Sequence, residues 1–505
     1  MEVCLVRTPR YVWPFNSGTS AFWQPLGLAC LAAAVRARLR GVNVRIIDCP
    51  AAGIGWRSLA AMLAELRPDV LGIGEETVSA AEGIRLARLV HEILPGCTVV
   101  AGGPFFGFMA GDVLGREPID VIVRGEGEET FVQLLQALAG KANLGAVNGL
   151  VFVSDGRMIE TPAREPVGDL DSLPVPAYDL LAMERYGARS RNHPGLAAAE
   201  HGRGCAHRCS YCSLWRHWGR GTGQDAQPCY RTKSAERSFD EIRMLVERFG
   251  RFTIGWVDAT WNLDPEWSDR FCGLMLRHGL KAQHTAWMRA DCVVRDEALG
   301  ILEKQVRAGL VQAMIGVERV RPGQLAALDR AADGAETARK AFDIFRRRYP
   351  HVYTIGTMIY GVWEETEQSL RELIDFEHTS GMDYGFYIPL TPNPGTPLWD
   401  EVKGNGRLAT RDFRAFNFHT PVLHTHDFRA EALHGIYRRI TMRPSLARLR
   451  HHARVLTSPG ARKRRVHRAL FRHGARIVWR SLLHGLRKGD GTPAVYSIKP
   501  DWYDD

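Results

Sequence analysis

The stretch Gly204-Cys205-Ala206-His207-Arg208-Cys209-Ser210-Tyr211-Cys212 contains three cysteines with the spacing C-x3-C-x2-C. A loop this short can bind three irons of a cubane cluster through three thiolates, and it offers no fourth thiolate for the last iron. That iron is then open to a further ligand. The spacing therefore predicts a [4Fe-4S] cluster with one open position, held by Cys205, Cys209 and Cys212.

The main alternative from these residues is a structural zinc site, in which Cys229 joins the three cysteines of the loop. Structural zinc sites are usually closed and tetrahedral, so a fourth cysteine nearby has to be considered. Zinc knuckles usually begin with C-x2-C, whereas this loop begins with C-x3-C. The spacing thus favours the iron–sulfur cluster over zinc.

Composition and length place the chain among ordinary soluble proteins. The chain has 505 residues, of which 45% are hydrophobic and 24% charged, enough for three domains. No apolar run approaches the ~20 residues that span a bilayer, and the first residues are typical of a strand rather than a signal peptide. The ten cysteines are then reduced thiols or metal ligands, and a cytoplasmic protein is predicted.

Residues 1–140 alternate strand-like and helix-like stretches, which predicts a doubly wound parallel sheet. Such sheets bind ligands beyond the carboxyl ends of their strands. The turn over residues 7–13 lacks G-x-G-x-x-G, so a dinucleotide is not expected. Glycine-rich segments follow three of the strands, where backbone can approach a large flat ligand. The candidate binding residues there are Gly74, Glu75, Thr77, Gly102, Gly103, Arg124, Gly125, Glu126 and Gly127.

Two further regions follow before the C-terminal segment. Residues 141–192 read as a linker with a small hairpin around Asp155-Gly156. From residue 193 to about 400 a second alternation of strands and helices predicts a parallel barrel, whose active site lies at the carboxyl ends of its strands. Asp258, Arg289 and Glu318 are candidate site residues at such ends.

The cysteine loop, with Tyr211 before its third cysteine, resembles the cluster loop of the radical S-adenosylmethionine (SAM) enzymes. The Gly-Gly-Pro segment at 102–104 and the Arg-Gly-Glu-Gly-Glu-Glu segment at 124–129 resemble the cobalamin-binding domain of one large subgroup. The layout as a whole is similar to the anaerobic magnesium-protoporphyrin IX monomethyl ester cyclase family and its methyltransferase relatives. This resemblance implies an α/β chain with a Rossmann-like cobalamin-binding domain (1–140), a partial (β/α)6 barrel (193–400) and a mostly helical, basic C-terminal domain (401–505).

The resemblance also implies cofactors and roles. The open iron would chelate SAM, and the glycine-rich segments of residues 1–140 would hold cobalamin. Tyr211 would lie against the adenine, Asp258 near the amino group, Arg289 on the carboxylate and Glu318 near the ribose. His91, the only histidine in the first 150 residues, falls within a predicted helix, so no histidine is placed to ligate cobalt from below.

The function that follows is a cobalamin-dependent radical SAM methyltransferase, which moves a methyl group from SAM by way of methylcobalamin to an unactivated carbon, or phosphorus, of a natural-product or lipid-like substrate. Two alternatives stay open: an oxidative cyclase acting on a tetrapyrrole, and a non-catalytic zinc and cobalamin sensor. Expected partners are a small-molecule substrate and an electron donor such as flavodoxin or ferredoxin, without nucleic acid.

The C-terminal segment is the basic part of the chain. The net charge is +10, and residues 438–488 contain 16 Lys or Arg and no Asp or Glu. Apolar residues recur there at helical spacing. Three interpretations stay open: a solvated helix packed on the barrel, contact with an anionic membrane surface or an acidic carrier protein, and nucleic-acid binding, which no recognised module accompanies.

Overall fold

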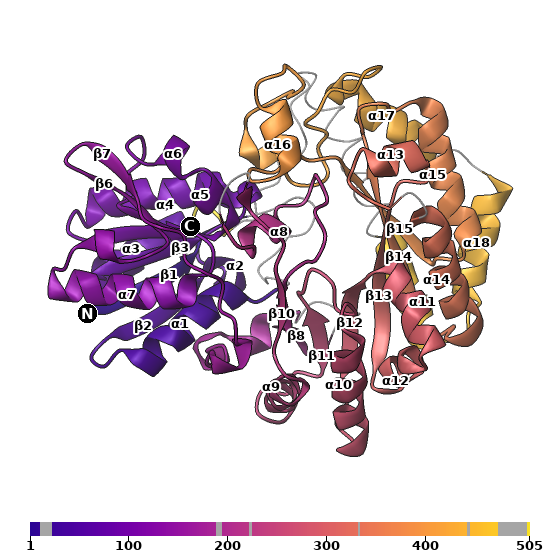
Figure 1. Cartoon of the computed structure of the whole chain (residues 1–505), viewed down its shortest axis with the longest axis horizontal. Coiled ribbons are helices and arrows are strands. Elements are labelled where there is room, and N and C mark those ends of the chain that lie inside the picture. The colour runs from indigo at the N-terminus through magenta and orange to yellow at the C-terminus, as the bar shows by residue number, and fades with distance from the viewer. Residues whose placement is uncertain (11–22, 188–193, 222–224, 332–333, 442–444, 473–501) are drawn as a thin grey trace.

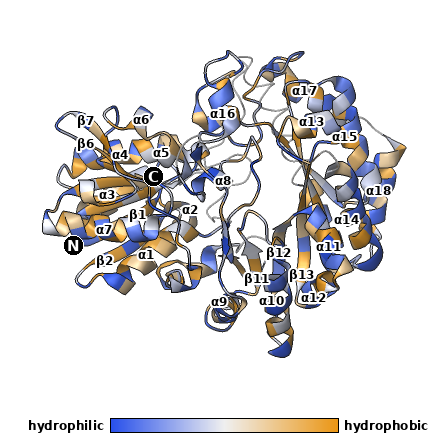
Figure 2. Cartoon of the chain, in the orientation of Figure 1, coloured by the Kyte–Doolittle hydropathy of each residue, from blue (hydrophilic) through white to orange (hydrophobic). Residues whose placement is uncertain are grey.

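The computed structural model describes residues 1–10, 23–187, 194–221, 225–331, 334–441, 445–472 and 502–505. Two sheets organise the chain, a mostly parallel one in the N-terminal domain and a parallel one in a partial barrel (Figure 1). The apolar residues gather on the central strands and on the helix sides that face them, while the outer helix faces are hydrophilic (Figure 2). This is the α/β architecture that the sequence predicts.

The N-terminal sheet has the order β2-β1-β3-β4-β5-β6-β7, and its first five strands are parallel. Its strands are β1 (Glu2–Arg7), β2 (Asn43–Asp48), β3 (Val70–Gly74), β4 (Thr98–Gly102), β5 (Val121–Val123), β6 (Leu150–Ser154) and β7 (Arg157–Glu160). Its helices are α1 (Leu26–Arg38), α2 (Cys49–Ala52), α3 (Trp56–Leu66), α4 (Ala80–Ile93), α5 (Gly103–Phe108), α6 (Ala110–Val113) and α7 (Gly127–Gly140), with short 3-10 turns at Thr77–Ser79 and Leu144–Ala146. Buried Val, Ile and Leu fill β1 and β3, as strands covered on both faces require.

The predicted hairpin forms, and it belongs to the N-terminal sheet. Strands β6 and β7 pair antiparallel, and β6 pairs with β5. Asp155 (φ 51°) and Gly156 (φ 73°) both have positive φ, the conformation of a two-residue turn that matches strand twist. The sheet therefore extends beyond residue 140 to Glu160.

The second sheet consists of six parallel strands in the order β15-β14-β13-β12-β11-β8, the partial barrel that the resemblance implies. Its strands are β8 (Leu196–Ala199), β11 (Thr253–Trp256), β12 (Gln283–Met288), β13 (Leu310–Glu318), β14 (Tyr353–Tyr360) and β15 (Tyr384–Pro389). Its helices are α9 (Ala235–Glu247), α10 (Pro265–Arg277), α11 (Ala290–Ala298), α12 (Ile301–Arg307), α13 (Pro322–Ala326), α14 (Gly334–Arg348) and α15 (Glu367–Ser380).

Local sequence fixes where these helices begin and end. Asp264 accepts hydrogen bonds from the first free backbone N–H groups of α10, whose first residue is Pro265. Thr366 and Ser369 form a capping box at the start of α15, and Gly381 ends that helix in the left-handed region. Each helix therefore returns the chain to the sheet at a defined residue.

Between the two sheets lie short connecting elements. They are the 3-10 turns Leu170–Ser172, Tyr178–Leu180 and Met183–Arg185, the antiparallel pair β9 (Gly202–Gly204) and β10 (Tyr230–Thr232), and α8 (Leu214–His217). Figure 1 shows α8 and β10 between the N-terminal domain and the barrel. The cysteine loop joins β9 to α8, so it lies where the two domains meet.

The C-terminal segment is mostly helical. It contains α16 (Pro397–Val402), a 3-10 turn at Phe413–Ala415, α17 (Ala430–Thr441), α18 (Leu446–Leu456) and helical residues 461–472. His451, Val455 and Val466 are buried, so the basic helices pack on the barrel up to residue 472. The basic residues from 473 onward lie outside the described residues. Residues 502–505 return to the N-terminal domain, where Trp502 and Tyr503 pack into its core.

Within the described residues, no helix is both long and apolar enough to cross a membrane.

Candidate active site

The cysteine loop is held at both ends and in its middle. Gly204 (φ 82°) precedes it, and a side chain there would meet the carbonyl oxygen of Cys229 at 1.8 Å, so only glycine fits. Within the loop, Cys212 N–H donates to the Cys209 carbonyl at 3.1 Å, and Trp215 Nε1–H donates to the same oxygen at 3.2 Å. These bonds give the loop one shape before any ligand binds.

The three thiols fit an iron–sulfur cluster by chemistry and by surroundings. Burial, opposed by backbone hydrogen bonds and assisted by the neighbouring thiols, raises the pKa of Cys212 to about 12. Burial also raises the pKa of Cys205, and nearby Arg289 and Arg330 oppose this. Thiolates gathered in a buried loop need cationic ligands, and soft thiolates select iron–sulfur clusters or zinc. Within the described parts of the chain, no three Cys, His, Asp or Glu side chains could hold a single metal ion.

One side chain near the cysteines was not predicted from the sequence. Arg330 follows α13 and donates to Cys209 Sγ at 3.9 Å and to the Gly316 carbonyl at 3.4 Å. Hydrogen bonds to cluster sulfurs tune reduction potential. Arg330 lies about 120 residues from the cysteines in sequence, within a loop that has no recognisable motif, so only the fold could reveal it.

Glu318 and Tyr211 meet beside Cys209. Glu318 ends β13, is buried and has a positive φ of 64°. Its pKa is raised by burial, and Arg330, Thr357 and a hydrogen bond from Tyr211 oppose that rise. A side chain at Gly316 would lie 2.6 Å from Glu318 Oε1, so the glycine makes room for this carboxylate. The structure thus places the residues predicted for the ribose and the adenine in contact with each other.

Asp258 follows β11 and holds the chain that leads into the cysteine loop. Its Oδ1 accepts hydrogen bonds from the backbone N–H groups of His201 at 2.9 Å and Gly202 at 2.6 Å. Its Oδ2 is buried and has no hydrogen-bond partner among the described residues. One carboxylate oxygen therefore anchors the chain that leads into the loop, and the other is buried and unpaired; the contact of Asp258 with the SAM amino group stays a prediction.

Arg289 follows β12 and makes a bidentate ion pair with Asp291, with Nε–Oδ1 and Nη2–Oδ2 distances of 2.9 and 2.8 Å. Burial raises the pKa of Cys205 and lowers the pKa of His207; the charge of Arg289 opposes the first shift and adds to the second, which places the guanidinium near the cysteine loop. A ligand carboxylate would exchange with Asp291 for the same bidentate geometry. Arg289 thus lies near the cysteine loop and is already paired with Asp291, and its contact with the SAM carboxylate stays a prediction.

The candidate residues of the N-terminal domain divide into two groups. The glycines at the ends of β3 and β4 border a turn in which Glu75 is buried and accepts bonds from Thr8 Oγ1 at 2.6 Å, Arg10 Nη1 at 2.6 Å and Ser79 Oγ at 2.7 Å. A side chain at Gly103 (φ 85°) would meet the Glu75 carbonyl at 3.1 Å. Glu75 therefore fixes the turn after β3 through its hydrogen bonds to protein groups. Gly74, Thr77 and Gly102 lie in the same region, at or near the ends of β3 and β4.

The second group, Arg124 to Gly127, follows β5 and lies against the elements that connect the two domains. Arg124 pairs with Glu160 and donates to the Thr161 carbonyl at 2.7 Å. Gly125 lies near the His217 carbonyl, 3.9 Å from where its Cβ would be. Glu126 and Gly127 lead into α7. This segment thus contacts the region that follows the cysteines.

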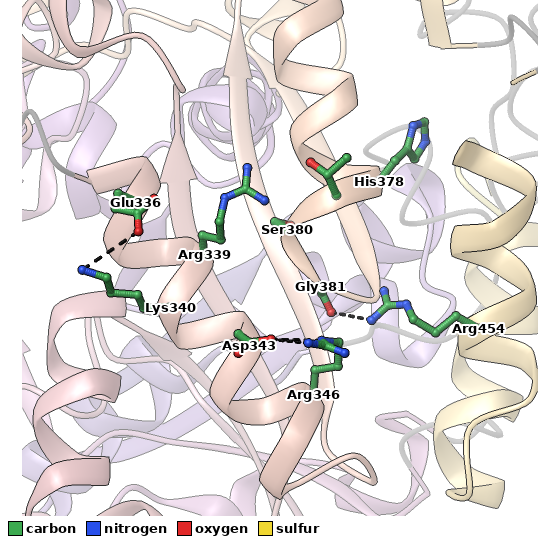
Figure 3. Close-up of a pocket in the computed structure, with 10 residues that line it drawn as sticks. Glu336, Arg339, Lys340, Asp343, Arg346, His378, Ser380, Gly381 and Arg454 are labelled. Atoms are coloured by element: carbon green, nitrogen blue, oxygen red, sulfur yellow. Dashed lines mark hydrogen bonds and ion pairs between the residues drawn. The ribbon is translucent and has the colours of Figure 1, made fainter. Parts of the chain in front are cut away.

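Two cavities in the described part of the chain differ in the elements that line them. One of about 440 Å³ lies between α14, α15 and α18, and its Arg339, Lys340, Arg346 and Arg454 side chains are drawn in Figure 3; it contains none of the predicted site residues. The other, of about 420 Å³, is lined by α5, Arg216 of α8 and Trp399 of α16. The second cavity therefore touches both domains.

Comparison with known proteins defines the class. Residues 19–135 match the B12 binding domain, and residues 199–376 match the Radical SAM superfamily. The chain is therefore a cobalamin-dependent radical SAM enzyme whose cofactors are a [4Fe-4S] cluster, SAM and cobalamin. This excludes the non-catalytic sensor that the sequence left open.

Three known proteins are similar to this chain over most of its length. The chain is 28% identical over 422 residues to an uncharacterized methyltransferase of Pyrococcus horikoshii, covering 82% of this chain and 86% of that protein. It is 28% identical over 439 residues to the anaerobic magnesium-protoporphyrin IX monomethyl ester cyclase of Cereibacter sphaeroides, covering 84% and 68%. The fold matches the radical SAM methyltransferase TsrM from Kitasatospora setae, solved with cobalamin and a [4Fe-4S] cluster, with a TM-score of 0.64 at 16% identity over 90% of this chain and 88% of that one.

Proposed function

We propose that this enzyme transfers a methyl group from SAM, by way of cobalamin, to an unactivated carbon, or phosphorus, of a natural-product or lipid-like small molecule. The observation that carries the proposal is the direct contact between the loop after β5 of the B12 binding domain and the strand that leads into the cysteines. Contact between the two cofactor-binding domains suits a reaction in which a substrate atom meets both cofactors.

When bound, the cluster supplies the electron that cleaves SAM to a 5′-deoxyadenosyl radical, and cobalamin carries the methyl group. The residues of the chain hold and enclose these groups. Cys205, Cys209 and Cys212 would bind three irons and leave the fourth open to SAM. Glu318 and Asp258 would orient the ribose hydroxyls and the amino group through their buried carboxylates. Burial of these groups also excludes water from a site that generates a radical.

The cavity between α5, α8 and α16 supports a small-molecule substrate. Phe108, Trp399 and Phe413 provide apolar surface there, and Arg216 and Lys403 add positive charge beside Asp400. Ligand sites are mostly apolar, with a few polar groups that fix orientation. This lining suits a substrate with an apolar body.

The partners and location that go with this proposal follow from the same chemistry. A cluster that must be reduced for each cleavage requires an electron donor such as flavodoxin or ferredoxin. All ten cysteines are free thiols in the structure, which suits the reducing cytoplasm. We also propose that the basic residues among 473–501 contact an anionic membrane surface or an acidic carrier protein.

Anaerobic reconstitution with iron, sulfide, cobalamin, a low-potential reductant and deuterated-methyl SAM tests the proposal. With candidate substrates, we expect S-adenosylhomocysteine, 5′-deoxyadenosine and a product that carries the deuterated methyl group. Formation of 5′-deoxyadenosine with a substrate that loses hydrogen but gains no methyl group would instead establish an oxidative cyclase, the function that the similarity to the Cereibacter sphaeroides protein favours.

A further inference from the structure

Four charged side chains form a buried cluster between the two domains. Glu126 immediately precedes α7 and Glu128 lies in its first turn, while Arg203 is in β9 and Arg231 in β10. Arg203 Nη2 lies 2.6 Å from Glu128 Oε1, Arg203 Nη1 lies 3.6 Å from Glu126 Oε2, and Arg231 Nη2 lies 2.5 Å from Glu126 Oε1. All four side chains are less than 10% exposed. We call these four residues the interdomain clamp.

The clamp is attached to both ends of the cysteine loop. Arg203 and Arg231 are opposite one another in the β9–β10 pair, and Arg203 is two residues before Cys205. Trp218 follows the loop and α8 and contacts both arginines. Its ring lies 5.0 Å from the Arg203 guanidinium carbon, and its carbonyl accepts from Arg231 Nη2 at 3.2 Å. A movement of either arginine would therefore move the chain on both sides of the cysteines.

On the other side, the clamp is attached to the end of the N-terminal sheet. Glu128 is in the first turn of α7, and Glu126 immediately precedes that helix after β5. Glu126 Oε2 also accepts from the backbone N–H of Val167 at 3.0 Å. Both carboxylates are thus occupied by protein partners at the edge where a parallel sheet binds its ligand. The sequence predicts Glu126 as a cobalamin contact, and its surroundings indicate a different task.

The charges make this contact rigid. A buried ion pair that loses one partner leaves an uncompensated charge in a low-dielectric interior, so neither side can separate from the other at small cost. Glu200 adds a third carboxylate, 2.9 Å from Arg203 Nη2. Arg203 thus bridges Glu128 of one domain and Glu200 of the other through a single guanidinium group, whose planar geometry fixes direction as well as distance.

We propose that the interdomain clamp sets the distance and orientation between cobalamin and the iron–sulfur cluster, so that Glu126, Glu128, Arg203 and Arg231 are positioning residues rather than cofactor contacts. The inference requires both cofactors to be bound, and it does not require methyl transfer. It therefore stands or falls separately from the function proposed above.

The test measures the magnetic interaction between cob(II)alamin and the reduced cluster in the full-length enzyme loaded with both cofactors, without SAM or substrate. This interaction broadens the cob(II)alamin electron paramagnetic resonance signal, speeds its relaxation and decreases steeply with distance. The variants are Arg203→Met and Glu128→Gln, with Arg203→Lys as the conservative variant. Arg88→Gln, which breaks an exposed ion pair with Glu117 inside the N-terminal domain, is the control.

We expect Arg203→Met and Glu128→Gln to keep at least half of the wild-type iron and cobalamin content and to show weaker interaction with a broader spread of relaxation rates. Arg203→Lys should recover part of the wild-type interaction, and Arg88→Gln should leave it unchanged. If both clamp variants retain the wild-type relaxation profile, the proposal is wrong. An equal change in Arg88→Gln would also overturn it, because the effect would then not come from the clamp.

Discussion

Replacing Arg319 by Met should destabilise the barrel more than any surface change of equal size. The Arg319 guanidinium uses all five of its N–H groups. It donates to Gln324 Oε1 at 2.9 and 2.6 Å, to the Ile359 carbonyl at 2.9 Å, and to the two Glu365 oxygens at 2.9 and 2.7 Å. Arg319 and Glu365 are both fully buried. The Arg319→Met variant would therefore leave the Glu365 carboxylate charged and buried without its cation.

Loss of one partner from a buried pair costs about 3–5 kcal/mol, whereas an exposed pair contributes about 0–1 kcal/mol. The larger cost increases the opened population of the barrel by roughly two to four orders of magnitude. Hydrogen exchange of the β13 and β14 amides measures this local opening directly. Arg88→Met is the matched control, since Arg88 makes a bidentate but exposed ion pair with Glu117.

The result that refutes this reasoning is a loss below about 1 kcal/mol in Arg319→Met, equal to the control. A double variant separates charge from packing. Arg319→Met with Glu365→Leu removes both charges, and replacing a buried pair by apolar residues is often neutral. We expect it to recover most, but not all, of the lost stability, because the N–H of Gly361 donates to Glu365 at 2.7 Å and would lose that acceptor.

Three shorter predictions concern the loop, the strand end and the C-terminal helices. Cys212→Ala should lose bound iron and SAM cleavage, while Cys229→Ala should keep both; iron loss in Cys229→Ala would contradict the three-cysteine assignment. Gly316→Ala should weaken SAM binding in a calorimetric titration with iron content unchanged, because the new methyl group would collide with Glu318. Burial lowers the pKa of His467 from 6.5 to about 4. Between these pH values the unfolded state binds more protons than the folded state, so the 461–472 helix should lose protection from hydrogen exchange, corrected for intrinsic rates, as pH falls from 6.5 to 4. Equal protection at pH 7 and pH 5 would contradict this.

The sequence predicts the parallel part of the N-terminal sheet and the six parallel strands of the barrel because these strands alternate with helices. The six barrel strands, from β8 (Leu196–Ala199) to β15 (Tyr384–Pro389), all lie within residues 193–400, where the second alternation of strands and helices is predicted. The attachment of β6 and β7 to the N-terminal sheet was not predictable, because a hairpin carries no signal that identifies its neighbour. Hydrophobic periodicity defines elements and leaves their partners open.

The sequence pattern gives hypotheses for site residues where neighbours in sequence act together, and it misses residues that act together from distant positions. The three cysteines act within one loop, so spacing alone indicates their role. Glu126 reads as a ligand contact because it follows a strand, yet its partner Arg203 lies 77 positions further along the chain, and no periodicity connects them. Arg330 beside Cys209 is missed for the same reason. Long-range ion pairs and hydrogen bonds depend on packing, which the sequence pattern does not contain.

The end of β13 shows why Arg319 matters beyond stability. Glu318 is in the left-handed region, which costs a residue with a side chain about 1–2 kcal/mol, and the pairing of β13 with β14 shifts register between Gly316 and Glu318. This conformation places the Glu318 carboxylate against Tyr211 rather than in the strand. The next residue, Arg319, is fixed by five hydrogen bonds and so holds the strained backbone in place. Arg319→Met therefore removes the restraint as well as the ion pair, and Glu318 should relax towards the extended conformation and away from the position predicted for the SAM ribose.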